Sequence, residues 1–203
     1  MRLYFFPGAC SMSPHITARE AGLDVTLVRV DPKTKKTEAG VDFFTVNPKG
    51  MVPVLELDDG SVLTEGPAIV QYLADQKPES GLAPKAGTIA RYRVQEWLNF
   101  ITSEIHKNFT PMFKPDTPED YKKIARANLE NRFAHVDKQL AGKQYLLGDQ
   151  FTVADAYLFT TVNWSRLHKM DLAAWPNLAA YMERVRMRPK VQEAMKAEGL
   201  LKA

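Results

Sequence analysis

Cysteine is nearly absent from this chain of 203 residues, in which Cys10 is the only one. A single cysteine cannot form a disulfide within the chain, which excludes the disulfide frameworks of small secreted domains and favours a reducing compartment. No apolar run approaches the ~18 residues that a membrane-spanning helix needs. The short apolar start at residues 3–6 is broken at once by Pro7, which does not suit a secretion signal. We therefore expect a cytoplasmic protein that has no membrane partner.

Long blocks of one charge are missing as well. The chain has 27 lysines and arginines against 24 aspartates and glutamates, a formal net charge of +3, and both signs are mixed along the sequence. This leaves no concentrated basic stripe of the kind that binds nucleic acid. His15, His135 and His168 have no metal-ligand spacing, so we expect no metal site. The remaining composition, 45% hydrophobic and 25% charged, is that of an ordinary globular protein.

The first eighty residues alternate short strand-like and helix-like segments. The pattern predicts strands at residues 3–6, 25–30, 52–57 and 61–63. It predicts helices that begin at Ser13-Pro14 and at Gly66-Pro67, where a proline in the first turn loses no hydrogen bond. The order is strand, helix, strand, then a hairpin and a helix. This order predicts a thioredoxin-like α/β domain over residues 1–78, with a mixed sheet flanked by helices.

The second half shows only helical periodicity. Residues 79–87 are dense in proline and glycine and form the expected linker. The all-helical domain is expected over residues 88–203, with helices at 89–113, 119–140, 153–168, 178–187 and 190–197. Thr152 and Asp155 have the spacing of a capping box, with Asp in place of the usual Glu, so we expect a structural role for both.

Cys10 lies in the turn that follows the first strand, close to the start of the first helix. A helix N-terminus favours the thiolate, and it can lower a cysteine pKa below its free value of ~8.5. On that basis we expect a reactive sulfur that iodoacetamide alkylates quickly at neutral pH. The alternative is a buried cysteine that behaves as a small hydrophobic residue. The absence of a C-x-x-C pair argues against a self-contained dithiol oxidoreductase.

Two further turns have groups that suit an amino-acid ligand. A cis bond between Val52 and Pro53 would turn the Val52 backbone outward, where it could bond an extended peptide; an ordinary trans bond is the alternative. At the next helix start, backbone N–H groups suit a carboxylate and Glu65 suits an ammonium group. The alternative for Glu65 is an acid that compensates the helix dipole.

A polar stripe is predicted on the first long helix of the second half. Asn99, Ser103 and His106 fall at positions i, i+4 and i+7, hence on one face of a regular helix. This face could form the wall of a wet cleft, or it could simply face solvent. Lys35, in the lysine cluster at residues 33–36, has no distinguishing feature of its own.

Four motifs in order resemble the cytosolic glutathione transferases, and most closely the bacterial beta class. They are the cysteine turn after Tyr4 (residues 7–11), the cis-proline loop at residues 47–55, the glutamyl-binding turn at 63–69 and the capping-box motif at 147–155. The resemblance covers essentially the whole chain. It implies a thioredoxin-like domain with a structural Pro53, followed by an all-α domain.

The resemblance also implies a glutathione site and a homodimer. From the first domain the site would use Cys10, Lys35, Val52, Glu65 and Gly66. Asn99, Ser103, Glu104 and His106 would complete it, some of them from the partner subunit. The family commonly has serine where Gly66 stands, so we expect weaker binding of the glutamyl carboxylate but no loss of it.

The implied reaction is conjugation of the glutathione thiolate to small hydrophobic electrophiles, a detoxification chemistry with no cofactor beyond glutathione as co-substrate. Phe5 and Phe6 leave no hydroxyl at the end of the first strand, so Cys10 and His106 are the expected catalytic neighbours of the sulfur. An apolar electrophile pocket is expected from a further set: Phe109, Phe113, Trp164 and Leu167.

Two other functions remain open at this point. The first is a glutathione-dependent thiol–disulfide reductase or reductive dehalogenase, in which Cys10 turns over through a mixed disulfide. The second is a non-catalytic binding module on the same fold.

Overall fold

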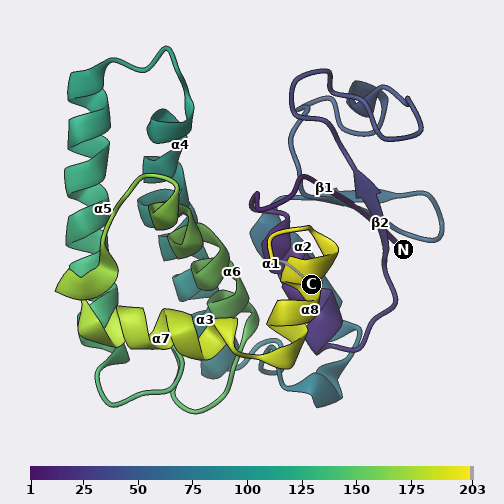
Figure 1. Cartoon of the computed structure of the whole chain (residues 1–203). Helices are drawn as coiled ribbons and strands as arrows, with labels where there is room; N and C mark the ends of the chain where they lie inside the picture. Colours follow the sequence, from purple (N-terminus) through teal and green to yellow (C-terminus); the bar gives the residue numbers. More distant parts are fainter. Residues whose placement is uncertain (202–203) are drawn as a thin grey trace. The chain divides into compact units, whose positions relative to one another are not determined.

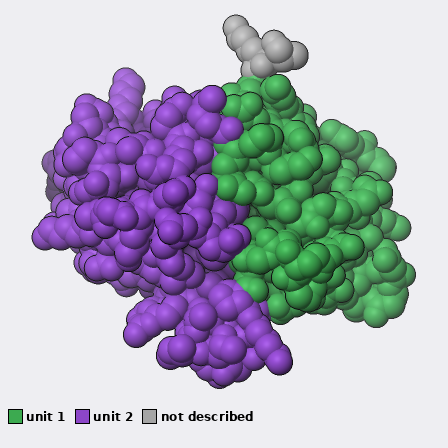
Figure 2. Space-filling view, turned by 90° about the horizontal axis from the view of Figure 1, so that it is seen from below, with its two compact units in different colours: residues 1–83, 188–203 green, residues 84–187 purple. Residues whose placement is uncertain are grey.

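The computed structural model describes residues 1–201 and divides the chain into two compact units (Figure 2). Unit 1 comprises Met1–Ala83 together with the C-terminal segment from Arg188, and unit 2 comprises Pro84–Met187. Each unit has its own core, and the two are described separately below.

Unit 1 is built on a four-stranded mixed sheet with the strand order β2-β1-β3-β4 (Figure 1). Its strands are β1 (Arg2–Phe5), β2 (Thr26–Arg29), β3 (Val54–Glu56) and β4 (Val62–Thr64). Strands β1 and β2 are parallel, because helix α1 (Met12–Glu20) connects them, whereas β3 and β4 form an antiparallel hairpin. The predicted thioredoxin-like order of elements is therefore confirmed.

The alternation of side chains along the strands gives the sheet two buried faces. Leu3 and Leu55 lie on the face covered by α1 and by α2 (Gly66–Asp75), and they form one core cluster with residues of both helices. Tyr4 and Val54, the neighbours of these leucines in the strands, lie on the other face in a second cluster with Phe43. Phe43 comes from the short 3-10 helix η1 (Phe43–Thr45). Burying each large apolar side chain contributes about 1.5–3 kcal/mol, so the two apolar clusters stabilise this small sheet from both faces.

Helix α8 (Pro189–Ala197) belongs to unit 1, where it packs on α1. This differs from the expected helical domain of residues 88–203. Arg188 at the start of α8 forms a bidentate ion pair with Glu20 at the end of α1, with N–O distances of 2.7 and 2.8 Å. Pairs of this geometry fix orientation as well as contributing energy. The periodicity of apolar residues predicts that this segment is a helix, but it does not predict which other helix the segment packs on.

The C-terminal end of α8 also contacts the turn that holds Cys10. The buried carboxylate of Glu198 accepts a hydrogen bond from the Gly8 backbone N–H at 2.8 Å and lies 2.9 Å from Nδ1 of His15. Gly8 has a φ of +73°, and a β-carbon placed on it would lie 3.4 Å from the Leu200 side chain. The positive φ therefore favours glycine at position 8, whereas the contact with Leu200 alone would tolerate a β-carbon.

Unit 2 is entirely helical in the residues described. Its α-helices are α3 (Ile89–Phe100), α4 (Lys107–Phe113), α5 (Glu119–Leu140), α6 (Val153–Val162) and α7 (Pro176–Arg186). Helix α6 is buried along its whole length and packs against α3 and α7. The predicted helix at 153–168 ends as an α-helix at Val162 and continues as the 3-10 helix η4 (Asn163–Arg166). Another short 3-10 helix, η5 (Leu172–Ala174), precedes α7.

The long helix expected at residues 89–113 has an irregular centre. Residues Ile101–His106 form a π-helical segment, η3, between α3 and α4. A π-helix bonds i to i+5 and takes more residues per turn, so faces assigned with a spacing of 3.6 no longer apply across it. The common face of Asn99, Ser103 and His106 can therefore not be derived from a spacing of 3.6, and it stays a prediction. Short π-helical segments are frequent at functional sites.

Asp155 is the polar centre of unit 2. Its fully buried carboxylate accepts hydrogen bonds from the backbone N–H groups of Leu146 and Thr152, from the Thr152 hydroxyl and from the Tyr181 hydroxyl. All four distances lie between 2.9 and 3.1 Å. The predicted capping box thus also ties the loop before α6, and α7 through Tyr181, to the start of α6.

Candidate functional site

Cys10 lies in the turn between β1 and α1, as its sequence position predicts. The turn is closed by the Ser11 side chain, which is 3.2 Å from both the N–H and the carbonyl of Phe6. The Cys10 thiol donates a hydrogen bond to the Val52 carbonyl oxygen at 3.2 Å. This contact places the sulfur next to the backbone of the cis-proline loop, one of the expected glutathione contacts.

The ionisation of Cys10 differs from the expectation. Burial raises the pKa of the thiol to about 12, and this effect exceeds the opposing one of the Cys10 and Ser11 backbone N–H groups. The helix N-terminus therefore does not produce a thiolate here, because desolvation of the charge outweighs it. At neutral pH, Cys10 is a neutral thiol that acts as a hydrogen-bond donor.

A slow alkylation of Cys10 follows from this pKa. With the thiolate almost absent at pH 7, we expect iodoacetamide to modify Cys10 more slowly than free glutathione, with a rate that still rises at pH 10. Mass spectrometry of time-quenched samples at several pH values measures this rate. A rate that levels off below pH 8 would contradict the assignment, and the Cys10→Ala variant serves as the unreactive control.

The loop at residues 47–53 brings the candidate residues of unit 1 together. Its Val52–Pro53 peptide bond is cis. Its Gly50 carbonyl accepts a hydrogen bond from Nζ of Lys35 at 3.0 Å, and its Val52 carbonyl accepts the one from Cys10. Asn47, which is buried, holds the loop through its side-chain amide, which donates to the Met51 carbonyl at 2.7 Å.

Glu65 is connected to the same loop through Lys49. Nζ of Lys49 lies 2.6 Å from Oε1 of Glu65 and 2.9 Å from the Thr64 hydroxyl. Both charged side chains are more than half exposed, so the pair contributes about 0–1 kcal/mol at most. A ligand with its own ammonium and carboxylate groups could therefore displace this pair at little cost. In the sequence, Lys49 has no distinguishing signal other than its place in the loop motif at residues 47–55.

Lys35 and Glu65 both have strained backbones. Their φ angles are +54° and +69°, in the left-handed region that side chains other than glycine rarely adopt. Of the three non-glycine residues with positive φ among those described, the only other is Lys169. Such strain costs about 1–3 kcal/mol and clusters at ligand sites. Two independently chosen candidates thus share a conformation typical of functional positions.

Gly66 follows Glu65 as the first residue of α2. Its φ lies outside the left-handed region, and a β-carbon placed on it would meet only the Pro53 ring, at 3.9 Å. That is an ordinary van der Waals contact. The structure thus leaves room for the serine that the family commonly has at this position.

In unit 2, the candidates Asn99, Ser103 and Glu104 lie on the surface of α3 and η3. Asn99 and Ser103 are exposed, and the Ser103 hydroxyl donates to the Asn99 carbonyl. Glu104, expected to face a partner subunit, pairs with Arg132 of α5 in the same chain at 2.7 Å. Each of these residues is therefore held by contacts within its own unit.

His106 ends η3 in a half-buried aromatic environment. Its Nδ1 is 2.7 Å from the hydroxyl of Tyr157, a buried residue of α6. Its ring packs against Trp164 with ring centroids 4.9 Å apart. The short hydrogen bond fixes the orientation of the imidazole ring. The second ring nitrogen, Nε2, lies on the other side of the ring from this hydrogen bond. Tyr157 was missed from the sequence, because a tyrosine in an apolar helix has no signal that distinguishes it from core.

Three of the four residues expected to form an electrophile pocket lie together. The rings of Phe109, Phe113 and Trp164 have centroids 5.4–6.4 Å apart. Phe109 and Trp164 are buried, whereas Phe113 is 47% exposed. Leu167 is 70% exposed and has no place in this ring cluster.

Residues 1–201 contain neither a metal cluster nor a membrane-spanning helix. No group of three histidine, cysteine or acidic side chains is placed to hold a metal ion. No helix in the same range has the length and hydropathy to cross a bilayer.

A thioredoxin-like sheet with a cis-proline loop, in a chain that also forms an all-helical unit, defines the architecture of the glutathione transferases. The family model described as the N-terminal domain of glutathione S-transferase matches residues 8–76, and the C-terminal domain model matches residues 100–189. The chain belongs to the glutathione S-transferase family.

Close relatives cover the full length of the chain. Glutathione S-transferase GstA of Escherichia coli O157:H7 is 52% identical over 98% of this chain and 100% of its own. A sphingomonad glutathione S-transferase solved in complex with glutathione is 49% identical, with a TM-score of 0.95 over 99% of this chain and 100% of its own. A beta-class enzyme of Sphingomonas chungbukensis is 48% identical, with a TM-score of 0.96 over the same shares. The predicted family and its bacterial beta class are therefore confirmed.

Proposed function

We propose that this glutathione transferase holds glutathione against the loop at residues 47–53 and transfers its sulfur to small hydrophobic electrophiles. The observation that carries the proposal is the convergence of Cys10, Lys35 and, through Lys49, Glu65 on that loop. The sphingomonad relative solved with glutathione supports the choice of ligand.

Each part of glutathione has a chemically matched group in unit 1. The Val52 backbone suits the extended cysteinyl segment, which would pair with it as a strand does. Glu65 suits the α-ammonium of the glutamyl residue, and the Gly66 N–H at the start of α2 suits its carboxylate. The Lys35 ammonium suits the glycyl carboxylate. Asn99, Ser103 and Glu104 remain proposed contacts of the same ligand.

For the chemistry, we assign His106 to the glutathione sulfur. A thiol must lose its proton to attack, and a half-buried imidazole can accept that proton or stabilise the thiolate. Cys10 is a neutral thiol with a single proton, which would have to turn from the Val52 carbonyl to donate a hydrogen bond to the developing thiolate. The electrophile is proposed to meet the rings of Phe109, Phe113 and Trp164, and the exposed Leu167 has the weakest claim among the four residues first expected there.

Tyr157→Phe tests the positioning of His106. The change removes the hydroxyl 2.7 Å from Nδ1 and leaves the buried ring in place, so we expect kcat to fall about tenfold, ~1.4 kcal/mol, with KM for glutathione nearly unchanged. The pH dependence of kcat should shift as well, because His106 loses a partner. The exposed Tyr92 gives the matched control, Tyr92→Phe. A variant with wild-type kcat and pH profile would refute the positioning role.

Gly66→Ser tests the proposed site of the glutamyl carboxylate. The side chain fits beside Pro53, and a new hydroxyl bond to a carboxylate is expected to lower the dissociation constant for glutathione about tenfold, ~1.4 kcal/mol. Gly66→Ala is the control, since it adds the carbon without the hydroxyl. Equal affinities of the serine and alanine variants would place the carboxylate elsewhere.

Titration calorimetry of the wild-type protein with glutathione tests the proposed function itself. We expect saturable binding of one glutathione per chain. A dissociation constant weaker than ~10 mM, roughly −2.7 kcal/mol, would refute the proposal.

We also propose a cytoplasmic homodimer that uses glutathione as its only co-substrate. The single cysteine and the dependence on glutathione suit a reducing compartment. Sedimentation at micromolar concentration should give twice the chain mass of 22.9 kDa, and a species of 22.9 kDa would refute the dimer.

The alternative reductase or dehalogenase, working through a Cys10 mixed disulfide, gains no support from a thiol whose pKa is about 12.

A further inference from the structure

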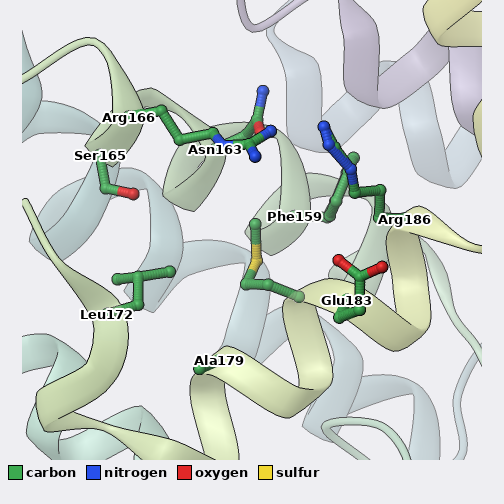
Figure 3. A pocket seen from close by; sticks show the side chains of 9 residues that line it. Phe159, Asn163, Ser165, Arg166, Leu172, Ala179, Glu183 and Arg186 are labelled. Atoms are coloured by element: carbon green, nitrogen blue, oxygen red, sulfur yellow. The ribbon is translucent and has the colours of Figure 1, made fainter.

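A cavity lies within unit 2, among α6, η4, η5 and α7 (Figure 3). It has a volume of about 170 Å³. A cavity of about 150 Å³ is known to accommodate a benzene ring, whereas a single water needs far less space. The cavity therefore has room for one small organic molecule.

One part of the wall is apolar, although five of the nine lining residues are polar or charged. Phe159 of α6, Leu172 of η5 and Met182 of α7 line it, and Phe159 and Met182 are buried. Figure 3 shows Phe159 on the upper side of the lined space and Ala179 on the lower side. Walls of this kind favour the apolar body of a ligand over bulk water.

One wall group is a buried hydroxyl without a partner. Ser165 is 1% exposed, and its Oγ makes no hydrogen bond with any residue that the structure describes. In Figure 3 its hydroxyl points from η4 into the lined space. Leaving a buried polar group unsatisfied is unfavourable, so a polar occupant that bonds to it would be stabilised.

The rim of the cavity has an excess of positive charge. Arg166 of η4 and Arg186 of α7 both line it, and no acidic group within residues 1–201 forms an ion pair with either guanidinium. Glu183 is the one acidic group among the lining residues. Guanidinium groups bind carboxylates in a bidentate geometry, which an unpaired pair of arginines is free to offer.

We propose that this cavity, here called the α6–α7 pocket, binds a small aromatic or aliphatic monocarboxylate. The apolar body lies against Phe159 and Met182, and the carboxylate lies at the rim with Arg166 and Arg186. All of these residues belong to unit 2, and none is among the residues proposed for glutathione. The pocket therefore shares no residue with the proposed glutathione site, although Ser165 directly follows Trp164 of the proposed electrophile site.

Sodium benzoate is the probe, because it combines a single ring with a carboxylate. Amide chemical shifts of the ¹⁵N-labelled full-length protein, titrated with benzoate, should change along residues 163–166 and 179–186, with a dissociation constant of about 1 mM. Benzyl alcohol, of nearly the same shape but neutral, should bind at least tenfold more weakly. Changes confined to other residues would overturn the proposal, and so would equal binding of the two probes.

Substitutions in the pocket test which arginines bind the carboxylate and whether benzoate occupies the space beside Ala179. Arg166→Gln combined with Arg186→Gln should weaken benzoate binding at least tenfold, whereas Arg184→Gln on the same helix should leave it unchanged. Ala179→Leu, a change on the partly exposed face of α7, should fill the pocket and abolish binding. Wild-type affinity in the double variant or in Ala179→Leu, with the folded spectrum retained, would refute the pocket as the site.

Discussion

Replacing Asp155 by alanine is expected to lower the free energy of unfolding by about 3–5 kcal/mol, the largest effect of any single change considered for the fold. The carboxylate accepts four hydrogen bonds from two backbone N–H groups and two hydroxyls. Alanine leaves these donors buried without acceptors, and each costs about 1–3 kcal/mol, offset in part by removing a buried carboxylate. Urea unfolding monitored by circular dichroism gives the change.

Two matched variants separate the contributions of Asp155. Thr152→Ala removes only the N-cap side chain and should cost about 1 kcal/mol. Asp155→Asn keeps one oxygen acceptor and should fall between wild type and alanine. A loss below 1 kcal/mol for Asp155→Ala would contradict the role of this carboxylate as the polar centre of unit 2.

The pH dependence of stability should report the same group. Burial raises the pKa of Asp155 to about 6, above the value of ~3.9 that an unfolded chain gives it. The folded state therefore binds more protons than the unfolded state between these values, and this contribution to stability is complete below pH 4 and lost as pH rises through 6. The stability of the wild type relative to Asp155→Asn should decline across that window. A constant difference would contradict the raised pKa.

Replacing His106 by alanine is expected to reduce kcat for conjugation about a hundredfold, with KM for glutathione changed less than threefold. Positioned acid–base groups contribute about 10²–10⁴ in rate, and about a hundredfold corresponds to ~2.7 kcal/mol of transition-state stabilisation. His135, exposed on α5, gives the control His135→Ala, which should keep wild-type kinetics. Wild-type kcat in His106→Ala would show that another group activates the sulfur.

Cys10→Ala provides the contrasting result. Because the thiol is neutral and only donates a hydrogen bond, conjugation should survive within about tenfold, ~1.4 kcal/mol. Any thiol–disulfide exchange should disappear completely, since it requires the sulfur itself. A thousandfold loss of conjugation in a variant that still binds glutathione would show that Cys10 has been given the wrong role.

The sequence predicted regular elements well where periodicity and end signals agreed. Helix α5 has the predicted bounds, because Pro118 and two acidic residues mark its start and an apolar period continues to Leu140. The four strands were predicted to within two residues at each end, since proline and glycine punctuate them. The structure brings Cys10, Lys35 and, through Lys49, Glu65 to the loop at residues 47–53, and the glutathione site that the family resemblance implies for them stays a prediction.

Features that depend on tertiary contacts could not be predicted. The π-helical segment at residues 101–106 has no sequence signature, so nothing in the sequence indicates that a spacing of 3.6 does not apply between Asn99 and His106. The pKa of Cys10 is set by the surrounding atoms rather than by its position in the chain. The association of α8 with α1 depends on Arg188 and Glu20, which are far apart in sequence. Tyr157 gained its role only from the fold.

The most direct test of the account is the initial rate of thioether formation from glutathione and 1-chloro-2,4-dinitrobenzene, with the purified wild-type protein and with His106→Ala. The account predicts a rate proportional to enzyme concentration, saturable in glutathione, and about a hundredfold lower in the variant. A wild-type rate equal to that of the uncatalysed reaction, from protein that is folded and binds glutathione, would contradict it.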